Sequence, residues 1–153
     1  MLVVVPLGWF SRRYAVRDTS RGEIGELGFA SLRERGALRV DGAEYQVSRE
    51  GLAGDFILAG GGGSVARAAK PSAFRRALFL KVGDTEYALR PESAFGRGYL
   101  ILAGDTQVGR IAPLRRWGRT LEADLPEQIA SPVRMFILWL VLLMVRRQRA
   151  SDS

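Results

Sequence analysis

The sequence contains no cysteine and no histidine. The absence of cysteine excludes disulfide bonds and thiol nucleophiles, and the absence of both residues excludes zinc sites of the Cys/His type. Without histidine, the chain also has no Ser-His-Asp triad. A chain without cysteine is compatible with any redox environment, so this absence does not indicate a compartment.

Lysine is scarce as well, because Lys70 and Lys81 are the two lysines among 23 basic residues. Arginine therefore carries the formal net charge of +7 and the pI of about 10.7. Such a surface favours anionic partners, namely nucleic acid, acidic lipid or an acidic protein. An arginine-rich proteome would give the same composition without any such partner, so the charge alone does not choose among these readings.

The 153 residues, 47% of them hydrophobic, suit one domain with a substantial core. The segment Met1–Phe10 is apolar, but no basic residue precedes it, and Arg12 and Arg13 follow it. A secretory signal has the opposite order, so we interpret this segment as a first strand. We expect a single domain over residues 1–149 and a disordered tail over residues 150–153.

The chain contains an internal repeat. Glu44–Val47 matches Glu86–Leu89 at an offset of 42 residues, and Phe56–Gly60 matches Leu100–Gly104 at an offset of 44. A third, weaker copy precedes these around Ile24. Each copy reads as four short strands separated by Gly, Asp, Ser or Pro, so three copies predict about twelve strands.

Glycine marks the turns between the predicted strands. Gly42 and the pair Gly83-Asp84 predict tight hairpins. The run Gly60–Gly63 also lies between two predicted strands. A phosphate-binding loop would end in Gly-Lys-Ser/Thr and lead into a helix, and neither follows this run. We therefore interpret it as a hairpin turn.

The segment Met135–Val145 is apolar on every face. Ser131 is expected as the N-cap and Pro132 as the first helical residue, which predicts a helix over about residues 132–147. A helix that is apolar all round is buried in protein or in lipid. Crossing a bilayer takes about 20 apolar residues, so this run favours a core helix. The alternative is a short C-terminal membrane anchor.

The inward faces of twelve strands need apolar side chains to pack against, and the apolar helix must be shielded from water on every face. Closing the sheet satisfies both needs and removes exposed strand edges. Because about eight strands already suffice for side chains to fill a barrel, twelve would leave room for a helix. The predicted fold class is therefore mainly β, a closed barrel of about twelve antiparallel strands wrapped around a buried hydrophobic C-terminal helix.

The fourfold strand grouping, the VAR and VGR strand starts at Val65 and Val108, and the run Phe136–Leu143 resemble the tubby C-terminal-like superfamily. This superfamily includes tubby-like proteins, LURP-one-related plant proteins and phospholipid scramblases. The resemblance covers almost the whole chain and implies a twelve-stranded barrel around a central helix. The palmitoylated cysteines of scramblases and an acidic calcium loop have no counterpart in this sequence. The phosphoinositide contacts of tubby proteins cannot be placed on it residue by residue.

Basic residues recur before one strand of each repeat copy. Equivalent positions in a closed, repeating barrel should lie at similar heights, so we expect these residues to ring one rim. Trp117 suits a membrane interface, because it combines an apolar ring with a polar N–H. The predicted ligand-binding residues are Arg33, Arg35, Arg75, Arg76, Arg115, Arg116, Trp117 and Arg119.

The leading hypothesis is a non-enzymatic module that binds anionic lipid headgroups or a membrane surface, in a cytoplasmic and peripheral location. The alternatives are a nucleic-acid-binding basic domain and a protein-interaction scaffold. We expect no enzyme activity, cofactor or metal site, and the oligomeric state is left open. Acids and a lysine that could act in catalysis show no diagnostic spacing: Asp55, Glu92, Asp105, Glu127 and Lys81.

Overall fold

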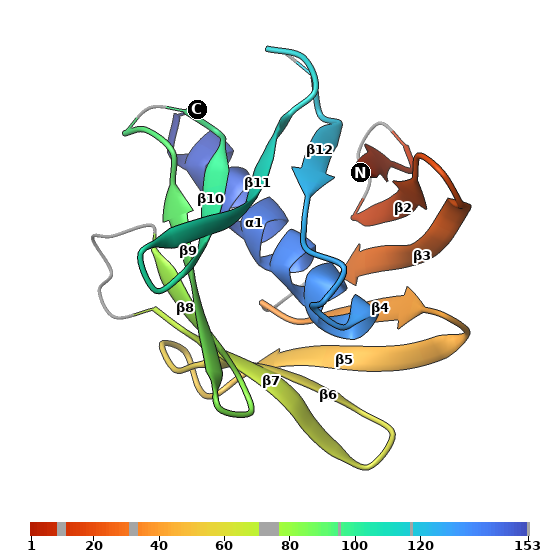
Figure 1. Ribbon diagram of the computed structural model, residues 1–153, viewed down its shortest axis with the longest axis vertical. Coiled ribbons are helices and arrows are strands. Elements are labelled where there is room, and N and C mark those ends of the chain that lie inside the picture. Colours follow the sequence, from red (N-terminus) through yellow and green to blue (C-terminus); the bar gives the residue numbers. More distant parts are fainter. Residues whose placement is uncertain (9–11, 31–33, 71–76, 95, 117, 153) are drawn as a thin grey trace.

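The computed structural model describes residues 1–8, 12–30, 34–70, 77–94, 96–116 and 118–152. Within these residues, twelve strands surround one helix (Figure 1). The strands are β1 Leu2–Pro6, β2 Arg13–Asp18, β3 Gly22–Phe29, β4 Gly36–Val40, β5 Ala43–Arg49, β6 Phe56–Gly60, β7 Gly63–Ala69, β8 Leu78–Val82, β9 Thr85–Pro91, β10 Tyr99–Ala103, β11 Thr106–Pro113 and β12 Leu121–Asp124. The helix is α1, Ser131–Asp152.

Each strand pairs antiparallel with its neighbours in the sequence, and β1 closes the barrel against β12. At this seam Leu2 pairs with Ala123 and Val4 pairs with Leu121. The helix lies inside the closed sheet (Figure 1), which confirms the predicted fold class. Closure leaves every strand paired on both sides, so the barrel presents no open edge for aggregation.

Because the strands alternate in direction, the barrel has two different ends. One end, the turn end, carries the short turns after β2, β4, β6, β8 and β10. At the β4–β5 turn, Asp41 and Gly42 have φ values of 52° and 76°, as a type I′ turn requires. The other end, the loop end, carries the longer connections after the odd-numbered strands.

The internal repeat is retained in the strand ladders. A β-bulge interrupts the register after Val16, Leu58 and Ile101, once in each copy. The predicted alignment of Phe56–Gly60 with Leu100–Gly104 is wrong by one residue, because Phe56 and Tyr99 occupy the same buried position. Side chains alternate between the two faces of a strand. Aligning the copies by their identical residues therefore matched inward positions of one copy with outward positions of the other.

The core is the apolar helix and the inward side chains of the barrel. Trp139 and Leu140 are fully buried, as the all-round apolar pattern predicts. The Trp139 ring stacks on Phe29 of β3 at 4.9 Å and meets Phe56 of β6 edge-on at 5.9 Å. Its Nε1 donates to the carbonyl oxygen of Gly28 at 3.0 Å. The apolar segment Met135–Val145, which the alternative reading treated as a membrane anchor, is thus buried inside the protein.

Both ends of the helix differ from the prediction. The amide of Arg134 donates to Ala130, so Ala130 holds the N-cap place and Ser131 is already helical. The Ser131 hydroxyl instead accepts from Arg134 Nη2 at 3.0 Å.

At the other end, the helix continues to Asp152 through most of the predicted disordered tail, and Ser153 lies outside the described residues. Contacts at the loop end support this extension, including a bond from Arg149 Nη2 to Gly118 O at 3.4 Å. Among the described residues, no helix combines the length and apolar character that a membrane crossing requires.

Candidate functional site

The helix runs from the turn end to the loop end of the barrel, and its C-terminus lies beside the β9–β10 connection (Figure 1). Its last turns therefore add their cations to those of the longer connections. The described arginines at this end are Arg12, Arg35, Arg97, Arg115, Arg116 and Arg119 in the connections and Arg146, Arg147 and Arg149 on the helix.

The opposite end of the molecule has a different character. Acidic residues in or beside its turns and before the helix include Asp18, Asp41, Asp84, Asp105 and Glu127. Asp and Gly are favoured in such turns for conformational reasons, so the acids also have a local cause. The loop end also holds Glu34, Glu50, Asp55 and Glu92, each in an ion pair with an arginine. Arginines outnumber these acids there, so the barrel has a charge asymmetry along its axis.

The structure places four of the predicted binding residues at the loop end. Arg35 is exposed in the β3–β4 connection, and Arg115 and Arg116 are exposed in the β11–β12 connection. Arg119, in the same connection, is half-buried and donates to Gly8 O at 3.4 Å. Their role in binding stays a prediction. The remaining predicted residues, Arg33, Arg75, Arg76 and Trp117, lie outside the described residues.

A pocket lies between the helix end and the neighbouring connections. Arg97, Arg119, Arg146 and Arg149 line it, and we call it the arginine pocket. Its apolar wall includes Leu121, Leu142 and Val145. None of the described residues that line this pocket is acidic. The space among these side chains is small, about 10 Å³, which is room for about one water molecule. The arrangement therefore gathers guanidinium donors beside apolar side chains at the surface and does not enclose a ligand-sized cavity.

The arginines of this pocket disfavour one another's charge. The pKa of Arg149 is lowered, first by the partial burial of its guanidinium and then by the positive charges of Arg97 and Arg119. Cations at a helix C-terminus complement the helix dipole, which explains part of the placement of Arg149. It does not explain Arg97 and Arg119, which come from two connections. A bound anion would relieve the repulsion among the three.

A second hollow adjoins the arginine pocket, and the two share Arg97 and Pro113. Arg116 also lines it, together with the paired side chains of Glu92 and Arg110. Both bonds of that pair measure 2.9 Å, and they are the main reason that the pKa of Glu92 is lowered. The hollow extends the arginine-lined surface from the helix end onto the outer wall.

Other cations of the loop end are held in an internal ion pair. Glu34 accepts from both Arg49 and Arg147, and the two guanidiniums lie 4.8 and 5.9 Å from the Phe56 ring centre. The nearby Lys70 has a lowered pKa, first from burial and then from the charges of Arg147 and Arg49. This group fastens the helix end to the β3–β4 connection, so we assign it a structural role.

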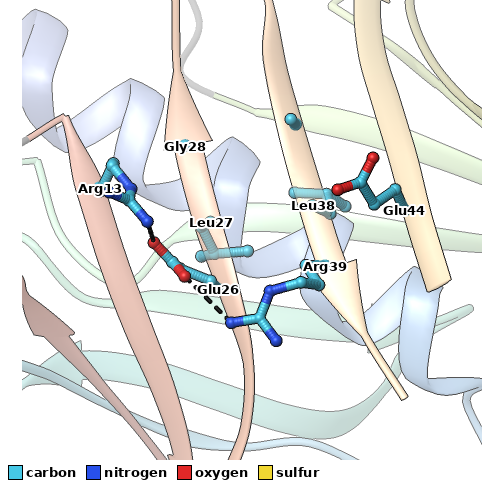
Figure 2. Close-up of a pocket in the computed structure, with 8 residues that line it drawn as sticks. Arg13, Glu26, Leu27, Gly28, Leu38, Arg39 and Glu44 are labelled. Atoms are coloured by element: carbon cyan, nitrogen blue, oxygen red, sulfur yellow. Dashed lines mark hydrogen bonds and ion pairs between the residues drawn. The ribbon is translucent and has the colours of Figure 1, made fainter. Parts of the chain in front are cut away.

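A hollow on the outer wall, shown in Figure 2, is lined by an ion-paired group whose central position recurs in each repeat copy. Glu26 on β3 contacts Arg13 on β2 and accepts from Arg39 on β4 at 3.0 Å, and the Arg39 bond is the first cause of its lowered pKa. The equivalent positions in the later copies are Arg67 and Arg110, both also in ion pairs. The same outward position thus carries an ion pair in all three copies. The pair joins neighbouring strands at Glu26, whereas Arg67 and Arg110 pair with acids of the loop-end connections, and we assign all three to stability.

The side chains considered for catalysis take part in ion pairs, turns or exposed wall positions. Asp55 pairs with Arg67 at 3.0 Å, Glu92 pairs with Arg110, and Asp105 occupies the β10–β11 turn. In the part of the chain that the structure describes, no group of three acidic side chains is placed to hold a metal ion. The absence of enzymatic activity stays a prediction.

Sequence reasoning missed Arg97 and did not connect the helix arginines with the rim. The strand topology indicates that the helix arginines and the connection arginines lie at the same end. A helix that follows β12 enters an antiparallel barrel at the turn end, so its C-terminus must emerge among the connections that follow odd-numbered strands. No residue-level pattern marks Arg97, because its partners in the pocket are distant in sequence.

Comparisons with family models, curated proteins and solved structures found no match to this chain. Membership of the tubby C-terminal-like superfamily therefore stays a prediction.

Proposed function

We propose that this protein is a non-enzymatic binding module whose loop end associates with an anionic membrane surface. The observation that carries this proposal is the convergence of arginines from several connections and from the helix end at one end of the barrel. Like charges repel, so a fold that gathers them at one end suits a partner of opposite charge. The proposed location is peripheral at a membrane.

The strength of such an association follows from the number of arginines. Each basic residue near an acidic leaflet contributes about 1 kcal/mol, so several acting together give reversible recruitment without a lipid anchor. The arginines that line the arginine pocket also present hydrogen-bond donors to headgroup phosphates at the protein surface. Guanidinium groups match the geometry of phosphate oxygens through paired hydrogen bonds. Arg97 and Arg119 come from two connections and Arg149 comes from the helix.

The buried helix supports surface attachment over insertion. Its apolar residues from Met135 to Val145 already lie inside the barrel, and releasing them would open the core. Binding through exposed arginines leaves that core intact. The expected interaction is therefore electrostatic, and it should weaken as salt screens the charges.

The test is sedimentation with vesicles of neutral phosphatidylcholine, with and without acidic phosphatidylglycerol, over a salt series. The variant Arg115→Ser/Arg116→Ser removes two exposed arginines of the loop end. We expect its affinity for acidic vesicles to fall on the order of 30-fold, from about 1 kcal/mol for each arginine. The matched control is Arg17→Ser/Arg21→Ser, which removes the same charge from exposed positions nearer the turn end.

Equal losses in the two double variants would show that overall charge, not the loop end, determines binding. Failure of the unchanged protein to bind acidic vesicles would overturn the proposal. A DNA duplex serves as the parallel ligand, because basic surfaces also bind nucleic acid with strong salt dependence. Tighter binding to DNA than to acidic vesicles at the same salt concentration would favour the nucleic-acid alternative.

A further inference from the structure

Exposed leucines accompany the arginines at the loop end. Leu7 is 48% exposed after β1, Leu52 is 94% exposed after β5, and Leu114 is 46% exposed after β11. Among the described residues, the other large hydrophobic side chains that are exposed are Met1, at the start of the chain, and Phe79, on the outer wall at 39%. Most of the exposed apolar side chains thus share the end of the barrel that carries the arginines.

The strand order spreads these three leucines around the rim. The β1–β2 and β11–β12 connections are near one another, because β1 pairs with β12. The β5–β6 connection, which holds Leu52, lies across the barrel from them. The helix end and the arginine pocket lie within the rim that these connections form. Three exposed apolar side chains thus lie around the arginines at one end of the barrel.

A single exposed leucine needs no explanation, since much of any protein surface is apolar. The combination is more specific, because apolar side chains beside cations are the composition of surfaces that rest in a lipid interface. A folded protein or nucleic-acid partner would not require the leucines to stand at separate tips. A bilayer does offer an apolar layer beneath a charged one over the whole width of the barrel.

We propose that Leu7, Leu52 and Leu114 insert into the interfacial layer of an anionic membrane while the loop-end arginines contact its phosphates. This inference rests on the proposed function and adds an orientation to it. The barrel axis and α1 stand steeply to the membrane plane. The turn end, with Asp41, Asp84 and Asp105, points away from the acidic surface that would repel it.

The absence of cysteine makes a direct test possible, because an introduced cysteine is the unique labelling site in the chain. The variant Leu52→Cys carries a polarity-sensitive nitrobenzoxadiazole fluorophore at the loop end. The matched control, Thr19→Cys, carries it in the β2–β3 turn at the opposite end, where Thr19 is also exposed. On vesicles of phosphatidylcholine and phosphatidylglycerol, we expect a blue shift and a rise in emission at position 52 and no change at position 19.

A second pair of variants measures the contribution of the leucines to affinity. We expect Leu52→Ser and Leu114→Ser each to weaken binding to these vesicles by about tenfold, since each removes apolar surface buried on insertion. Phe79→Ser is the control, because it removes an exposed apolar side chain from the barrel wall. Because Phe79 lies on the outer face of β8 and not in a connection, this variant should weaken binding less than either leucine variant. Thermal melts should show that the leucine variants remain folded.

The outcomes separate this inference from the proposed function. If the protein binds acidic vesicles but the label at position 52 stays in water, insertion is wrong and the electrostatic association stands. Equal responses at positions 52 and 19 would also overturn the orientation. If no version of the protein binds acidic vesicles, the proposed function fails, and the insertion fails with it.

Discussion

Gly36 lies where the barrel wall comes closest to Trp139. A Cβ atom at this position would overlap Trp139 Nε1 and the carbonyl oxygen of Gly28, two atoms that are themselves hydrogen-bonded. We therefore expect Gly36→Ala to lower the free energy of unfolding by about 1–3 kcal/mol, the usual cost of overpacking a filled core. Chemical denaturation with a tryptophan fluorescence readout measures this loss and reports on the Trp139 environment at the same time.

Gly28 provides the matched control for this substitution. A Cβ atom there would meet Ala37 O at 3.8 Å, which is ordinary van der Waals contact. Replacing glycine by alanine in a strand reduces the entropy of the unfolded chain, so Gly28→Ala should be neutral or slightly stabilising. A destabilisation as large as that of Gly36→Ala would show that strand propensity, not contact with Trp139, decides both values.

The helix is the element on which the rest of the barrel depends. Leu140 is fully buried near its middle. A carboxylate at that point would lose its hydration without a partner, at a cost of several kcal/mol, comparable to the stability of a whole domain. We expect Leu140→Asp to abolish cooperative folding, as judged by thermal melting and by the loss of near-ultraviolet circular dichroism.

Leu140→Met is the control, since it retains volume and apolarity and should cost less than about 1.5 kcal/mol. A Leu140→Asp protein that melts cooperatively near the temperature of the unchanged chain would contradict deep burial of the helix.

The stability of the whole molecule should depend on pH through its paired carboxylates. Hydrogen bonds from Ser20 lower the pKa of Asp18 to about 2, and bonds from arginines lower the pKa values of Glu26 and Glu92 from their ordinary 4.5. A carboxyl whose pKa is lower in the folded state stabilises the fold above its unfolded pKa. That contribution is lost as the pH falls through the folded pKa.

We therefore expect the melting temperature to vary little from pH 8 to 5, where the chain has no histidine to titrate, and to fall from about pH 4.5 towards pH 2. The variant Glu26→Gln/Glu92→Gln should have a lower melting temperature at pH 7 and a shallower decline below pH 4.5. A decline that begins near pH 6, or one that the double variant leaves unchanged, would contradict this account.

The sequence by itself determined the fold class. Alternation at Glu44–Arg49 and Glu86–Arg90 specified strands, and the all-round apolar run at Met135–Val145 specified a buried helix. Both are local patterns, since each follows from which face of an element must avoid water. The repeat added the strand count, although matching by letters misplaced Phe56 by one position.

The tertiary structure decided which residues from distant parts of the chain lie close together. Neither the arginine pocket nor the ring of exposed leucines is visible in the sequence, because Leu7, Leu52, Arg97 and Arg149 are separated by long stretches of chain. They meet because the alternating strands send every second connection to one end and the helix emerges there. Burial is a property of each element's own pattern, whereas proximity between elements exists only after the barrel has closed.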